Sequence, residues 1–237
     1  ASREVRPMAS FSPAVPVAQA PPEARTQYMT RVYARLLVGL AGFVLGSMAL
    51  FATGLAYSIA SFVLGVNWLL ILGGFMLVSW MSSSLLARAE TTAAQYGAYA
   101  AIVAANVVLF ATPLVIAQEF APEGTITLAA QLSVVAFIAL SVIAIRTAKD
   151  FSFLRGILLF GGVLALLAIV ASTLFGVGLG IWFAVAMIGY AGAAILYDTQ
   201  KVYRTYPLGT ETAAAVRLFS SLTLLFWYVL QALSMER

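Results

Sequence analysis

Long runs of uncharged, mostly apolar residues constrain this chain more than any other feature of its sequence. The first run, residues 36–87, contains 52 positions without a charged side chain. Further uncharged runs cover 91–118, 124–145, 156–197 and 218–235. A membrane-spanning helix needs about 20 apolar residues. The two longest runs can therefore hold two spans each and the others one each, so the sequence predicts seven transmembrane helices.

The composition indicates that lipid, and not water, surrounds most of the chain. Hydrophobic residues make up 62% of the sequence and charged residues only 9%, whereas soluble domains carry about 25% charged residues. The formal charge of +4 comes from basic residues that stand singly between apolar runs, so we expect the bilayer as a partner and no nucleic acid. The chain contains neither Cys nor His, which excludes thiolate sites and the Ser-His-Asp triad. We expect neither an enzyme nor a bound cofactor.

The distribution of basic residues predicts the orientation of the helices. We place the spans near 32–56, 67–87, 93–117, 127–147, 154–174, 179–203 and 213–233. With these spans, 12 of the 13 Lys and Arg residues fall on one side and only Arg237 falls on the other. Basic residues near span ends favour the cytoplasm. The expected fold is an all-α integral membrane protein, a seven-helix bundle with a cytoplasmic N-terminus and its C-terminus outside.

Residues 1–28 differ in composition from the rest of the chain. They hold five of the eight prolines among many Ala and Ser residues, a composition that does not favour a packed core. We therefore predict a disordered cytoplasmic arm at 1–28 and a seven-helix transmembrane domain at 29–237. A plain tether fits this composition better than a partner-binding segment, although both interpretations stay open.

Asp198 is the acidic residue that falls inside a predicted span. It lies in the sixth span, toward the cytoplasmic end, and an ionisable group at membrane depth costs several kcal/mol unless it is paired, hydrated or protonated. Because burial disfavours the charged carboxylate, Asp198 is a candidate pH sensor on an ion pathway. The alternative is an interfacial Asp198 that pairs with Lys201, three residues on. The sequence offers no second acid inside a span, so we set intramembrane aspartyl proteolysis aside.

Other polar and small residues at membrane depth have a plainer interpretation. Ser220 and Ser221 in the seventh span must each find a hydrogen bond, and helix–helix contact is the most common solution. Gly42 and Gly46 form a small-xxx-small pattern, as do Gly189 and Ala193. Such patterns are typical of closely packed helices.

Three segments carry a resemblance to a known family. The hexapeptide Ile195-Leu196-Tyr197-Asp198-Thr199-Gln200 resembles the sixth helix of the Bax inhibitor-1 family. Residues 31–37 (RVYARLL) resemble the family's opening motif, and the stretch from Thr147 through Ser152 and on to Ser172 resembles its junction between the fourth and fifth helices. The resemblance covers about residues 29–233. The short loops and the lack of charge outside suggest a bacterial member in the inner membrane.

The resemblance implies a fold and an activity. The fold is six helices around a central one, and the activity is a pH-sensitive calcium leak closed by two aspartates, one on the sixth helix and one on the seventh. Asp198 matches the first aspartate, whereas Ser221 stands at the position of the second. The arginine expected to latch the pair would fall near Ser84 or Leu85. With calcium as the transported ion, Asp198 and neighbouring hydroxyls such as Ser220 and Ser221 would form only a weak site.

Because the sequence differs from the family pattern at Ser221 and near Ser84, two function classes stay open. The leading hypothesis is a weak or altered cation leak, controlled by Asp198 and involving Ser220 and Ser221. The rival is a non-conducting regulatory or assembly partner of another membrane complex, such as a membrane-anchored ATP-dependent protease, as the resemblance suggests for bacterial relatives. A water-filled path to Asp198 would separate the two, because only a conductor needs one.

Overall fold

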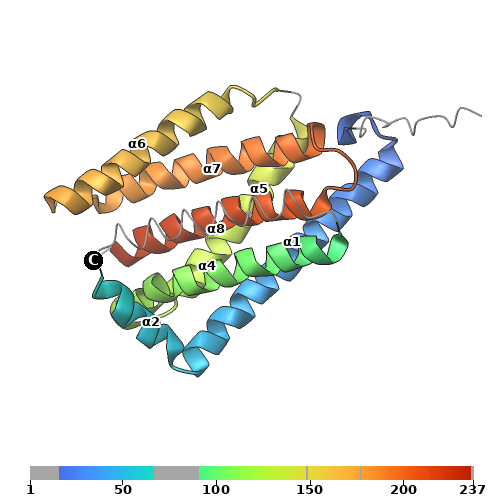
Figure 1. Cartoon of the computed structure of the whole chain (residues 1–237). Coiled ribbons are helices and arrows are strands. Elements are labelled where there is room, and N and C mark those ends of the chain that lie inside the picture. Colours follow the sequence, from blue (N-terminus) through green and yellow to red (C-terminus); the bar gives the residue numbers. More distant parts are fainter. Residues whose placement is uncertain (1–15, 67–90, 148, 177, 236–237) are drawn as a thin grey trace, which may run out of the picture.

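The computed structural model describes residues 16–66, 91–147, 149–176 and 178–235. This part of the chain contains seven α-helices, one short 3-10 helix and no β-strand. Six of the helices are long and apolar enough to cross a membrane. The all-helical membrane fold expected from the uncharged runs is therefore confirmed at this level (Figure 1).

Five of the predicted spans, 93–117, 127–147, 154–174, 179–203 and 213–233, are matched by helices to within three residues at each end. The elements are η1 (Val17–Gln19), α1 (Pro22–Ala52), α2 (Leu55–Leu64), α4 (Thr92–Phe120), α5 (Thr125–Arg146), α6 (Leu154–Phe175), α7 (Gly180–Arg204) and α8 (Glu211–Met235). The predicted span 67–87 lies outside the described residues. The short helix α2 was not expected; it follows Gly54, whose φ of 75° lets the chain turn after α1.

The prediction of a disordered arm through residue 28 is wrong for residues 16–28. Helix α1 begins at Pro22, ten residues before the predicted span, with a proline at its first position. Before it, Val17 is fully buried in η1. The Pro-rich composition hid this order because proline suits the first turn of a helix as well as a loop. Residues 1–15 lie outside the described part.

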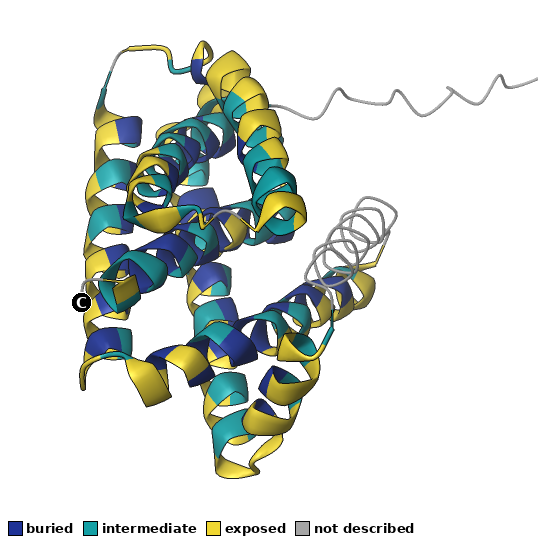
Figure 2. Ribbon diagram, turned by 90° about the vertical axis from the view of Figure 1, so that its left-hand side faces the viewer, coloured by how far each residue is buried: buried dark blue, intermediate teal, exposed yellow. Residues whose placement is uncertain are grey.

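Helix α8 lies at the centre of the bundle, between α7 and α4 in Figure 1, and it also packs on α1 and α5. In its most apolar stretch 67% of the residues are buried, whereas the corresponding value for α6 is 6%. Figure 2 shows this contrast as dark blue inside and yellow on the outer helices. The resemblance implies six helices around a central one; in the described part of the chain α8 packs on four of the other helices, α1, α4, α5 and α7.

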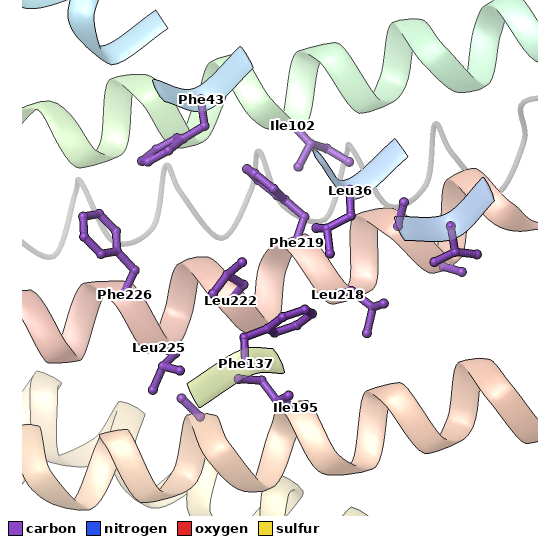
Figure 3. Close-up of a cluster of buried hydrophobic side chains, with 14 of the residues drawn as sticks. Leu36, Phe43, Ile102, Phe137, Ile195, Leu218, Phe219, Leu222, Leu225 and Phe226 are labelled. Carbon is purple, nitrogen blue, oxygen red and sulfur yellow. The ribbon is translucent and has the colours of Figure 1, made fainter. Parts of the chain in front are cut away.

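The core around α8 is largely aromatic and aliphatic (Figure 3). Phe110 stacks on Phe226 with ring centroids 5.6 Å apart, and Phe43 meets Phe110 edge-on at 5.1 Å. Offset-stacked and edge-on pairs add about 0.5–1.5 kcal/mol each beyond the burial of their surface. Outward-facing residues are apolar too: Trp182, on α7, is 82% exposed. Helices that carry apolar side chains both toward the core and on their outer face suit a lipid environment.

Small residues let α1 approach α4 closely. A Cβ added to Gly46 would lie 2.9 Å from Val107, and one added to Gly42 would lie 3.5 Å from Val103. The small-xxx-small interpretation is thus confirmed for this pair. It is wrong for Gly189, because a Cβ added there would meet no atom within 4 Å.

The basic residues of the described helices gather at one end of the bundle. At this end, which we call the basic end, Arg25 and Arg35 of α1 contact the end of α7 and the start of α8. Arg204 of α7 contacts the residue that follows α5. At the opposite end of the bundle, the Tyr57 hydroxyl donates to Glu119, in the last turn of α4, at 2.9 Å. This hydrogen bond raises the pKa of Tyr57, because a phenolate beside a carboxylate is disfavoured.

Candidate functional site

Asp198 is held by two residues of the central helix. Its side chain is 10% exposed. The Arg217 Nε donates to its Oδ1 at 2.6 Å, and the Ser221 hydroxyl donates to its Oδ2 at 2.5 Å. Arg217 and Ser221 stand four residues apart on α8, so both face the same side of that helix. The predicted candidates Asp198 and Ser221 are therefore in direct contact, across the α7–α8 interface.

Two tyrosines interact with the guanidinium of Arg217. Its Cζ lies over the ring of Tyr197, 5.9 Å from the centroid. The hydroxyl of Tyr206, in the turn between α7 and α8, also interacts with it electrostatically. A cation over an aromatic face gains about 0.5–2 kcal/mol, more where water is excluded. Arg217 is thus fixed by its surroundings as well as by Asp198.

The local alternative pairing is wrong, because the structure pairs Asp198 with Arg217 and not with Lys201. The Lys201 ammonium lies over the ring of Tyr197, 5.6 Å from its centroid. Residues four apart on a helix are neighbours, so Lys201 reaches Tyr197 while Asp198 turns toward α8. Asp198 therefore belongs to the packed interface between helices.

Ser220 does not join Asp198. Its side chain is exposed, and its hydroxyl donates to the Val216 carbonyl of its own helix at 3.0 Å. Ser84 and Leu85, near which the resemblance places a latching arginine, lie outside the described residues. In the described part of the chain, the cation beside Asp198 is Arg217.

The residues after Asp198 join α7 to other elements. The Thr199 hydroxyl forms a hydrogen bond with that of Ser141 on α5, at 3.3 Å. The Gln200 side chain accepts from the Phe151 N–H at 2.7 Å and donates to the Lys149 carbonyl at 2.8 Å. It thereby fixes the segment between α5 and α6. Three consecutive side chains of the hexapeptide thus contact α8, α5 and the segment between α5 and α6.

The same connecting segment contains a capped turn outside the spans. Asp150 Oδ1 accepts hydrogen bonds from the Ser152 hydroxyl at 2.6 Å and from the Ser152 N–H at 2.9 Å. The Ser152 hydroxyl, its N–H and, to a smaller extent, Arg204 favour the carboxylate and lower the pKa of Asp150 below its ordinary value.

A second buried acid, Glu211, was missed by the sequence analysis. It is the first residue of α8, and its side chain is 10% exposed. Its carboxylate lies 3.3 Å from Arg35 and 3.7 Å from Arg31, both on α1. Arg35 also donates to the Thr212 hydroxyl at 3.0 Å. Two signals could have found this cluster: an acid favoured at a helix start, and two arginines four residues apart on one face of α1.

The chemistry of the Asp198 site is that of an ion-pair contact between helices. Both carboxylate oxygens already accept hydrogen bonds, and a guanidinium beside them repels a further cation. Among the described residues there is no group of three or more acidic side chains that could hold a metal ion. A calcium ion could bind Asp198 only after Arg217 had moved away.

Comparison with known proteins assigns the family. The family model described as "Inhibitor of apoptosis-promoting Bax1" matches residues 25–237. The chain belongs to the Bax inhibitor family. A comparison with curated proteins finds no match. The resemblance seen in the sequence is thus confirmed, and this Bax inhibitor family protein is a multi-pass membrane protein.

The matched range includes every residue of the Asp198 site. In this Bax inhibitor family protein, α8 presents a serine to the sixth-span aspartate at the position where the resemblance implies a second aspartate. One turn earlier, α8 adds Arg217. Asp198, Arg217 and Ser221 thus form one contact at the position where the resemblance implies two carboxylates.

Proposed function

We propose that the chain crosses a bacterial inner membrane seven times, with its N-terminus in the cytoplasm and its C-terminus outside. The gathering of Arg25, Arg35, Lys149 and Arg204 at one end of the bundle supports this orientation. Basic residues near span ends are retained on the cytoplasmic side. On this orientation, Asp198 lies six residues, or about 9 Å along the helix, from the cytoplasmic end of α7.

We propose that the protein is a cation leak, with calcium as a candidate ion. On this proposal, the contact between Asp198, Arg217 and Ser221 closes the ion path. The observation that carries this proposal is the buried Asp198 bound through both of its oxygens to the central helix. A cation that passes between α7 and α8 at this level must displace Arg217. Protonation of Asp198 would weaken the same contact, which gives the leak a pH dependence. The proposal involves no catalysis and no cofactor.

Calcium flux into proteoliposomes tests the leak. Flux is measured at about pH 6 and about pH 8, one value on each side of neutral pH. The parent is compared with Asp198→Asn, Arg217→Gln and Ser221→Ala. Ser234→Ala is the matched control, because the Ser234 hydroxyl donates to its own helix at Leu230. We expect a pH-dependent flux in the parent and in the control, loss of the pH dependence with Asp198→Asn, and a higher flux with Arg217→Gln. Background flux in the parent and in all variants would overturn the leak.

One observation favours a second function, that of a non-conducting partner of another membrane complex. Both oxygens of Asp198 are occupied, and Arg217 neutralises its charge, which is an arrangement suited to a permanent helix contact. The test reconstitutes the chain together with a membrane-anchored ATP-dependent protease and measures substrate turnover. A change in turnover that survives Asp198→Asn, with background flux throughout, would favour this function over the leak.

A further inference from the structure

The segment before α1 is attached to the turn between α7 and α8. Pro16 forms an isolated antiparallel bridge with Pro207, and the Val17 N–H donates to the Tyr206 carbonyl at 2.8 Å. Val17 is 0% exposed and Ala20 4% exposed. A terminal segment that buries apolar side chains and pairs its backbone is held in place and does not trail freely. We call residues 16–21 the N-terminal strap.

Arg25 joins the strap to α7. One of its amino groups donates to the Ala18 carbonyl at 2.9 Å and to the Ala20 carbonyl at 3.3 Å. The other donates to the Tyr203 hydroxyl at 3.3 Å, and the Arg25 guanidinium lies over the Tyr203 ring, 5.6 Å from its centroid. The strap, the start of α1 and the end of α7 therefore form one connected unit.

The same turn leads to the Asp198 contact. Tyr206 receives the strap through its backbone carbonyl, and its side chain interacts with Arg217, which in turn binds Asp198 at 2.6 Å. Any movement of α7 away from α8 at the basic end must carry along the residues that connect them. Because the strap ties these residues to α1, which itself packs on α8, its release must accompany such a movement.

We propose that the N-terminal strap is an autoinhibitory contact: docked on the α7–α8 turn it keeps the Asp198–Arg217 pair closed, and undocked it frees α7 to move from α8. The effect on ion flux rests on the proposed leak, whereas the effect on the accessibility of Asp198 does not. The strap acts through Tyr206 and Arg217, so its residues are positioning residues and touch no ion.

Adjacent positions in the strap offer a matched pair of variants. Val17→Asn places a polar side chain in a fully buried position, whereas Ala18→Asn makes the same change at an exposed one. In the full chain in liposomes, a water-soluble carbodiimide with an amine labels accessible carboxylates, and mass spectrometry reads the rate at Asp198. Glu119, exposed at the opposite end of the bundle, is the internal reference.

We expect about tenfold faster labelling of Asp198 in Val17→Asn, which corresponds to a loss of about 1.4 kcal/mol of docking free energy. Ala18→Asn and the Glu119 reference should match the parent. Arg25→Gln, which removes the bonds to Tyr203 and to the strap carbonyls, should act in the same direction and guards against a folding defect specific to Val17→Asn. Labelling of Asp198 at the parental rate in both Val17→Asn and Arg25→Gln would overturn the proposal.

Flux measured on the same liposomes separates this proposal from the leak. Faster labelling together with higher flux supports both. Faster labelling with background flux in the parent and in every variant supports the strap and overturns the leak. Higher flux in Val17→Asn without faster labelling overturns the strap as a device that acts on Asp198.

Discussion

Removal of the cation beside Asp198 should destabilise the bundle strongly, and Arg217→Met makes this change while it keeps much of the apolar stem. At 2.6 Å, an effective dielectric constant of about 20 gives an attraction of about 6 kcal/mol. Desolvation offsets part of it, and breaking a buried pair from one side costs about 3–5 kcal/mol. Because the Arg217 side chain is 37% exposed, screening lowers the cost, and we expect about 2–3 kcal/mol.

A double-mutant cycle with Asp198→Asn isolates the pair. The asparagine oxygen can still accept from the Ser221 hydroxyl, and Arg217 can reach water, so this single change should cost about 1 kcal/mol. In the double variant no unpaired charge remains, and the coupling energy should be about 2 kcal/mol. Equilibrium unfolding in mixed detergent micelles, followed by circular dichroism, measures the three free energies of unfolding against the parent.

Two results would refute this reasoning. A cost below about 0.5 kcal/mol for Arg217→Met would place the pair with surface ion pairs, which contribute little. Costs that simply add in the double variant would show that Arg217 and Asp198 act independently. Either result would also remove the physical basis for Arg217 as the residue that closes the α7–α8 interface.

Three further predictions concern other parts of the bundle. Gly39→Ala places a Cβ against the Tyr99 hydroxyl, so overpacking should lower the free energy of unfolding in detergent by about 1–3 kcal/mol. Gly97→Ala meets no atom within 4 Å and should raise the free energy of unfolding in the same assay. Glu211→Gln should cost about 1–3 kcal/mol in the same unfolding assay, because two arginines of α1 lose their anion. The pKa of Asp150 is lowered in the folded state, so its carboxylate stabilises the fold above the unfolded-state pKa, and this stabilisation is lost as pH falls through the folded-state pKa. Carboxyl NMR should place the titration midpoint of Asp150 below 3.8. Asp150→Asn should remove this acid dependence of the free energy of unfolding.

The helices were predictable because the property that creates them is local. Each uncharged run is long enough to cross a bilayer, so both ends of α5, α6 and α7 fall within two residues of the predicted ones. The start of α1 was not predictable from the same property, because the residues before 32 are polar and rich in proline. They become helical through contacts with α7 and with the turn that follows it, which are distant in sequence.

The candidate site was predictable in part for a related reason. Asp198 stands out because a charge within an apolar run has no neighbour that explains it. Its partner could not be derived from spacing, since the helix geometry that suggested Lys201 says nothing about which side chains face the next helix. Arg217 was counted among the basic residues of the cytoplasmic side although the predicted span 213–233 contains it, and the structure shows that it faces Asp198 of α7.

The central helix is bound by opposite charges on two sides within its first two turns. Glu211 binds the arginines of α1, and six residues later Arg217 binds Asp198 of α7. Six residues advance about 9 Å along the helix, so the two contacts lie at successive levels. A rotation of α8 that preserved one contact would break the other, because the partners belong to different helices. Opening at Asp198 is therefore better served by a movement of α7, the helix to which the N-terminal strap is attached, than by a movement of α8.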